Sequence, residues 1–153
     1  SQDADMVAAL EIADIEPLLE VLEDDFYVDS GAVREAIEQK KSFNIIHLET
    51  MFKIDIFVPD FSGLTGEIFS RRRAEEIIEG KPVYVYSPED IILGKLDWYR
   101  KGKEVSDRQW QDVLGVMKVQ GSNLDLEYLI FQTERHGLRQ LLDRALEQAG
   151  LHS

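Results

Sequence analysis

An alternating segment, residues 52–58, constrains the fold of this chain more than any other part of it. Side chains two residues apart in a strand point to the same face of a sheet, so Lys53 and Asp55 share one face. Residues 43–48 alternate in the same way, and only a short connection around Glu49 and Thr50 separates the two segments. This pattern predicts an antiparallel hairpin that is half buried in a sheet.

Three aspartates lie on predicted strands. Asp3 and Asp5 begin a strand predicted over residues 3–9, and their spacing places the two carboxylates side by side. If this strand is a neighbour of the strand that carries Asp55, the three carboxylates can meet at one point. Hard divalent cations such as Mg²⁺ prefer oxygen ligands of this kind, and phosphate oxygens and water usually complete the shell. We therefore treat Asp3, Asp5 and Asp55 as candidate metal ligands.

The remaining patterns predict an α+β protein. A mixed sheet is expected within residues 1–86 and a helical part over residues 87–150, together forming a single domain over residues 1–153. Residues 61–66 are predicted to be a loop, and a second hairpin is expected to turn at Gly80. The periodicity and capping residues predict helices over 14–23, 31–39, 88–101, 106–120, 125–136 and 138–149.

Two charged residues lie in apolar arcs of predicted helices. At about 100° per residue, Lys95 falls near the middle of the apolar arc of its helix, and Asp112 falls between Val116 and Val119 in the next one. A lysine is seldom buried without a partner, because removing an ammonium group from water is costly. The pattern indicates either a buried ion pair or a polar site where the helices meet the sheet.

Composition narrows the class of partner. The formal net charge of −13 argues against an extended surface for nucleic acid, since no broad basic face can hold a phosphate backbone. The chain contains no cysteine, which excludes disulfides and thiol chemistry. Without a membrane-length apolar run or a signal peptide, a bacterial-type cytoplasmic protein is the expectation.

Four segments together resemble the nucleotidyltransferase superfamily, specifically its small bacterial members of the minimal-nucleotidyltransferase and abortive-infection toxin type. The resemblance covers most of residues 1–120. It is carried by Asp3-Ala4-Asp5, Lys53-Ile54-Asp55, the run from Ser87 to Leu96 and the run from Arg108 to Leu114.

The resemblance implies a nucleotidyltransferase-like sheet and a metal-dependent enzyme that transfers a nucleoside monophosphate from a nucleoside triphosphate to an acceptor hydroxyl. It implies Mg²⁺ or Mn²⁺ bound by Asp3, Asp5 and Asp55, with Asp55 also taking the proton of the acceptor. Lys95 would contact the triphosphate, and Asp112 would orient Lys95 or a nucleotide hydroxyl. Implied partners are an acceptor protein or RNA end and, within a toxin–antitoxin system, a second copy of the chain or an antitoxin or toxin protein.

One feature of the family is not found in the expected place. The family carries a glycine-rich turn and a helix just before its Asp-x-Asp strand, where the triphosphate is held, and this chain begins after that point. Gly121 and Ser122 do not replace the turn, because they follow a helix and no strand. We therefore expect the chain to be truncated at its N-terminus and impaired in catalysis.

Two other functions remain open at this stage. The first is a non-catalytic member of the same fold, used as a binding or antitoxin module with a vestigial acidic site. The second is a Mg²⁺-dependent phosphohydrolase, which needs no glycine-rich turn but gives Lys95 a less specific role.

Overall fold

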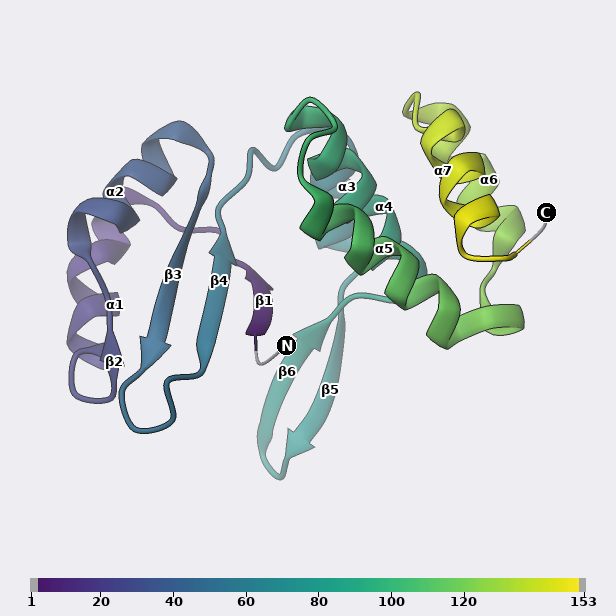
Figure 1. The fold of residues 1–153 in the computed structure, drawn as a ribbon. Coiled ribbons are helices and arrows are strands. Elements are labelled where there is room, and N and C mark those ends of the chain that lie inside the picture. Colours follow the sequence, from purple (N-terminus) through teal and green to yellow (C-terminus); the bar gives the residue numbers. More distant parts are fainter. Residues whose placement is uncertain (1–2, 152–153) are drawn as a thin grey trace. The chain divides into compact units, whose positions relative to one another are not determined.

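The computed structural model describes residues 3–151, and the chain divides into two compact units, Ser1–Phe61 and Ser62–Ser153 (Figure 1). Each unit has its own hydrophobic core. The first unit contains a four-stranded mixed sheet, and the second contains a two-stranded hairpin among helices. The protein is therefore α+β with a helical C-terminal half, as the sequence predicted.

The first unit alternates strands with short helices. Its elements are β1 (Asp3–Val7), the 3₁₀ helix η1 (Ile12–Asp14), α1 (Ile15–Leu22), β2 (Phe26–Tyr27), α2 (Ser30–Gln39), β3 (Ser42–His47) and β4 (Lys53–Phe57). The strands lie in the order β1-β4-β3-β2. The predicted antiparallel hairpin of β3 and β4 is confirmed, and β1 runs parallel to β4, which makes the sheet mixed.

The core of the first unit lies between one face of the sheet and the helices. Ile45 of β3 and Ile56 of β4 are buried together with Val33 and Ile37 of α2. The strand residues occupy alternate positions, and the helix residues are four apart, so each element presents one apolar side to this core. The other side chains of β3 and β4, including Asp55, consequently lie on the opposite face of the sheet.

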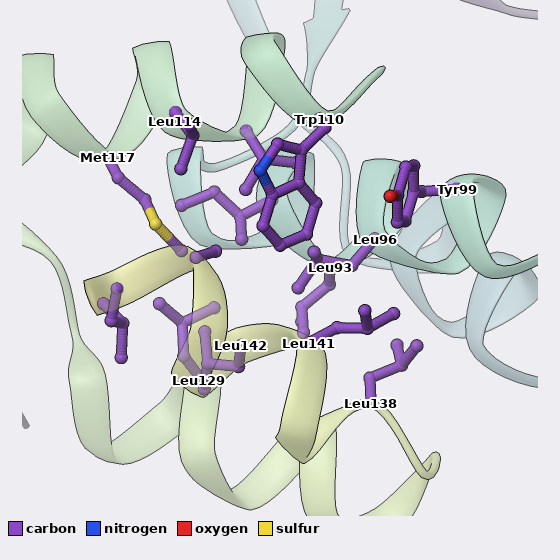
Figure 2. Packing of buried hydrophobic residues seen from close by; sticks show 14 of the residues in the cluster. Leu93, Leu96, Tyr99, Trp110, Leu114, Met117, Leu129, Leu138, Leu141 and Leu142 are labelled. Carbon is purple, nitrogen blue, oxygen red and sulfur yellow. The ribbon is translucent and has the colours of Figure 1, made fainter. Parts of the chain in front are cut away.

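The second unit is mostly helical. Its elements are α3 (Gly63–Ser70), β5 (Arg73–Ile78), β6 (Lys81–Val85), α4 (Pro88–Lys101), α5 (Asp107–Gln120), the 3₁₀ helix η2 (Gly121–Asn123), α6 (Leu126–Arg135) and α7 (Arg139–Gln148). Figure 2 shows its core, in which Leu96, Met117 and Leu142 are fully buried. The rings of Tyr99 and Trp110 pack with their centroids 5.1 Å apart, so these aromatic residues belong to the core.

The predicted helix ends follow from local chemistry. Ser87 and Ser106 each accept a hydrogen bond from the backbone N–H three residues later, as N-terminal caps do. Gly137 and Gly150 follow α6 and α7 with φ angles of 71° and 78°. Glycine adopts this left-handed conformation without the steric cost that a side chain brings, so both positions end a helix favourably.

The predicted loop over residues 61–66 is wrong, because α3 begins at Gly63. The two glycines, Gly63 and Gly66, lower intrinsic helix propensity and gave the segment the composition of a turn. Leu64 and Ile68, four residues apart, are 5% and 2% exposed and face the core of the second unit. Their burial offsets the weak propensity of the glycines.

The hairpin of β5 and β6 was predicted, but it does not belong to the mixed sheet that was expected within residues 1–86. The four-stranded sheet ends with β4, and within residues 3–151 β5 and β6 pair only with each other. Arg72 covers this hairpin at one end, with its guanidinium 4.0 Å from the ring centroid of Phe69 and 5.1 Å from that of Tyr84. Alternation predicts a strand without indicating which sheet it joins, and the single-domain arrangement stays a prediction.

Helix length bears on membrane insertion. Helices α4 and α5 have 14 residues each. In the part of the chain that the structure describes, no helix is long and apolar enough to cross a bilayer.

Candidate functional site

Asp5 and Asp55 lie opposite each other on neighbouring strands of the first unit. Strands β1 and β4 are parallel, and the Cα atoms of these two residues are partners in the ladder. Neighbouring strands are about 4.8 Å apart and partners share a face, so the two side chains project side by side. The sequence placed the aspartates on two strands, and the register now shows that Asp5, and not Asp3, faces Asp55.

Asp3 lies on the same face, two residues earlier along β1. Its partner in the ladder is Lys53, and two residues of a strand span about 6.6 Å. Asp3 and Asp5 are exposed, whereas the side chain of Asp55 is 13% exposed, because β4 lies between β1 and β3. The three aspartates therefore share one face of the sheet, with Asp55 the most enclosed.

Lys53 adds a positive charge beside this group. Its Nζ atom lies 3.8 Å from Oδ1 of Asp55, and its side chain is 36% exposed. That distance exceeds hydrogen-bond length, so the attraction is Coulombic and is screened by water. Lys53 thus offsets part of the negative charge of Asp55.

The donor set fits a divalent cation by its chemistry. Mg²⁺ is usually held by one or two carboxylates, with substrate phosphates and water as the other ligands. Asp5 and Asp55 supply two aligned carboxylates on one face. Among residues 3–151, no three His, Cys, Asp or Glu side chains converge as a complete ligand group. Asp5 and Asp55 are therefore the pair that best fits the predicted cation, and Asp3 is the third carboxylate of that face.

A further polar residue next to this pair was missed. Asn44 of β3 is the ladder partner of Asp55, so it lies on the same face as the carboxylates. Its neighbours in the chain, Phe43 and Ile45, are buried on the other face. The signal was present in the sequence, because a polar residue at an alternate position of a central strand marks the face that does not enter the core.

Lys95 and Asp112 form an ion pair between α4 and α5 of the second unit. Nζ of Lys95 lies 3.0 Å from Oδ2 of Asp112 and 3.5 Å from the side-chain oxygen of Gln109. The lysine side chain is 17% exposed and the aspartate side chain 37%. Of the two structures that the sequence left open, the ion pair is formed, although it is only partly buried.

Asp112 lies at the edge of the buried stripe of α5 and not within it. The sequence placed it between Val116 and Val119, but Val119 is 82% exposed and Val116 is half-buried. The apolar side of α5 is centred on Val113 and Met117, both fully buried. The apolar arc drawn at about 100° per residue included Val119 because this residue is apolar, yet the neighbouring elements do not cover that side of the helix.

A second charged cluster, centred on Asp90, was not predicted. Asp90 lies in the first turn of α4, and its side chain is 5% exposed. Its carboxylate accepts two hydrogen bonds from Arg71, at 3.0 and 3.1 Å, and one from the hydroxyl of Tyr128 at 2.7 Å. Because Arg71 directly follows α3 and Tyr128 belongs to α6, this carboxylate connects three helices of the second unit.

The Asp90 cluster also changes two pKa values. The hydrogen bond to Asp90 raises the pKa of Arg71, although burial opposes this. Burial, followed by the hydrogen bond to Asp90, raises the pKa of Tyr128 above its usual value of 10.0. Arg71 therefore remains charged and Tyr128 neutral at physiological pH, so both can donate hydrogen bonds to Asp90.

Glu67 of α3 binds the C-terminal end of α6. Its oxygens lie 3.2 Å from Nη2 of Arg135 and 3.1 Å from Nε2 of His136. The hydrogen bond from Arg135, with help from His136 and against the effect of burial, lowers the pKa of Glu67 below its usual value of 4.5. Ionised Glu67 therefore stabilises the folded state at neutral pH.

Replacing Glu67 with Gln is expected to make the free energy of unfolding depend less on pH in the acidic range. A folded-state pKa below the unfolded value gives stability that is present above about pH 4.5 and lost as the pH falls through the folded-state pKa. Because the side chain of Glu67 is 33% exposed, the expected loss at neutral pH is at most about 1 kcal/mol. Urea unfolding at about pH 7 and pH 3.5 measures the difference.

The control for this variant is Glu147→Gln, which changes an exposed glutamate of α7. The stability of Glu67→Gln should fall less between the two pH values than that of the control. Equal falls would show that Glu67 carries none of the acid sensitivity.

Comparison with known proteins found no matching family model and no significant match to a curated protein or a solved structure.

Proposed function

We propose that the protein is a metal-dependent nucleotidyltransferase, which transfers a nucleoside monophosphate from a nucleoside triphosphate to an acceptor hydroxyl. The observation that carries the proposal is the pairing of Asp5 with Asp55 on adjacent parallel strands, with Asp3 on the same face. Two aligned carboxylates and a nearby third match the oxygen ligands that Mg²⁺ takes together with phosphate. The resemblance of the sequence motifs supports the same reaction.

In the proposed reaction, Asp5 and Asp55 would hold Mg²⁺ or Mn²⁺ together with substrate phosphate and water, and Asp3 is the third carboxylate of the same face. When bound, the cation supplies neutralisation of phosphate charge and a lower pKa for the attacking hydroxyl. Asp55 would accept the proton of that hydroxyl as a general base. Lys53, 3.8 Å away, limits the repulsion between the carboxylates.

Lys95 and Asp112 have binding roles in this proposal. As the resemblance implies, Lys95 would bind phosphate oxygens as a point charge, and Asp112 would orient its ammonium group. The support is the 3.0 Å ion pair, which fixes the direction of a partly buried lysine side chain. By resemblance, the proposal extends to a cytoplasmic protein of a bacterial toxin–antitoxin system.

A thermal shift experiment on the full-length protein tests the proposal. One of ATP, CTP, GTP or UTP should raise the melting temperature in the presence of Mg²⁺ and lose this effect with a chelator. A ligand at 100 times its Kd adds about 2.7 kcal/mol of stability. For a protein of this size that corresponds to roughly 2–4 °C for each kcal/mol.

The outcomes separate the three functions. A Mg²⁺-dependent shift with release of pyrophosphate supports nucleotidyl transfer. Release of free phosphate in place of pyrophosphate identifies a phosphohydrolase. An unchanged melting temperature with every nucleotide would contradict the proposed enzymatic function and would leave the non-catalytic binding module as the function.

A further inference from the structure

A row of three polar residues crosses the open face of the sheet. Asp5 of β1 is the ladder partner of Asp55 of β4, and Asp55 is in turn the partner of Asn44 of β3. Partners share a face, and strands are about 4.8 Å apart, so the Asn44 amide extends from the same face one strand beyond Asp55.

The composition of this row is unfavourable for a sheet. Asp and Asn are depleted in strands, where β-branched and aromatic residues pack better. The opposite face of the same strands follows the usual rule, with Phe43, Ile45 and Ile56 in the core. The polar row therefore lies on the face of the sheet that does not enter the core, where a ligand can reach it.

The side chain of Asn44 is available to a ligand. Asn44 is exposed, and its amide makes no hydrogen bond with the residues that the structure describes. A side-chain amide both donates and accepts hydrogen bonds. A hydroxyl group does the same, whereas phosphate oxygens only accept and are bound better by Lys or Arg.

We propose that Asn44 hydrogen-bonds a sugar hydroxyl of the nucleotide whose phosphates are held at Asp5 and Asp55. This inference rests on the proposed function. In a nucleotide the sugar is bonded directly to the α-phosphate, so a sugar hydroxyl lies within a few ångströms of the phosphate oxygens. A side chain on the strand next to Asp55, about 4.8 Å away, can therefore reach this sugar hydroxyl.

The experiment compares Asn44→Ala with Ser42→Ala, a control on the same face of the same strand two residues away. Isothermal titration measures Kd in Mg²⁺ for the nucleoside triphosphate that gives the largest thermal shift and for its 2′-deoxy and 3′-deoxy forms. Asn44→Ala should bind the ribonucleotide about tenfold more weakly, the loss expected for one hydrogen bond. Ser42→Ala should bind it as the wild type does.

The deoxy nucleotides identify the hydroxyl. The wild type should bind one deoxy form about tenfold more weakly than the ribonucleotide, and Asn44→Ala should not distinguish these two ligands. An equal loss of affinity for all three nucleotides would place Asn44 against the phosphates or the base and overturn the inference. Urea unfolding of both variants shows whether a change in folding contributes.

Two further outcomes separate this inference from the proposed function. If Asp55→Asn abolishes Mg²⁺-dependent binding while Asn44→Ala retains the wild-type Kd, the inference fails and the proposed function stands. If the wild type binds no nucleotide, both fail.

Discussion

Replacing Asp55 with Asn is expected to abolish Mg²⁺-dependent nucleotidyl transfer by the full-length protein. The amide has nearly the shape of the carboxylate, but it lacks the negative charge that binds the cation and cannot accept the proton of the acceptor. A positioned general base alone contributes about 10²–10⁴-fold to the rate, and loss of a metal ligand adds to that. Release of pyrophosphate under saturating Mg²⁺ and nucleotide measures the effect.

The control for Asp55→Asn is Asp24→Asn, which removes the same charge from an exposed position of the first unit. The contact of Asp55 with Lys53 is partly exposed and 3.8 Å long. Its loss should therefore change the free energy of unfolding by no more than about 1 kcal/mol. A folded Asp55→Asn variant with undiminished turnover would remove Asp55 from the mechanism.

Replacing Asp90 with Ala is expected to cost the second unit about 3 kcal/mol of stability, which urea unfolding measures. The substitution removes the acceptor of the Arg71 and Tyr128 hydrogen bonds. Arg71 then keeps its longer, 4.0 Å contact with Glu67. Breaking a buried ion pair from one side costs about 3–5 kcal/mol. The lower value applies because the Arg71 side chain is 32% exposed and regains contact with water.

Two variants show whether the charge of Asp90 carries this effect. Tyr128→Phe removes one hydrogen bond and keeps the ion pair, so it should cost about 1 kcal/mol. Asp107→Ala removes an exposed acidic residue from the first turn of α5, as Asp90→Ala does in α4, and should cost less than about 1 kcal/mol. An Asp90→Ala variant no less stable than Asp107→Ala would show that Asp90 acts only on the helix dipole.

The periodicity of apolar residues and the capping residues were sufficient to predict most of the helices and strands. The alternation of residues 52–58 identified β4 and its polar face, and Ser87 and Ser106 identified the starts of α4 and α5. The inward position of Lys95 and the nearby acidic residue in the next helix indicated either an ion pair or a polar site, and the structure shows the ion pair. These features depend on residues close together in the chain, so sequence spacing determines them.

Features that depend on distant residues were found less often. The pairing of Asp5, and not Asp3, with Asp55 is a matter of register between strands almost 50 residues apart, which alternation cannot fix. The cluster around Asp90 was not predicted either, because its partners Arg71 and Tyr128 lie 19 and 38 residues away in the chain. One local feature was missed as well: Asp97 pairs with Arg100 and Lys101, which follow it at the i+3 and i+4 spacing of helical ion pairs.

The position of β1 has a consequence for any ligand that Asp5 and Asp55 share. In the order β1-β4-β3-β2, the five-residue strand β1 lies at the edge of the described sheet and is held by a single ladder, to β4. Edge segments of this kind detach and reform more easily than central strands. Part of the binding free energy of such a ligand then serves to hold β1 in the sheet. Bound ligand should therefore slow amide hydrogen exchange along β1 more than along β3.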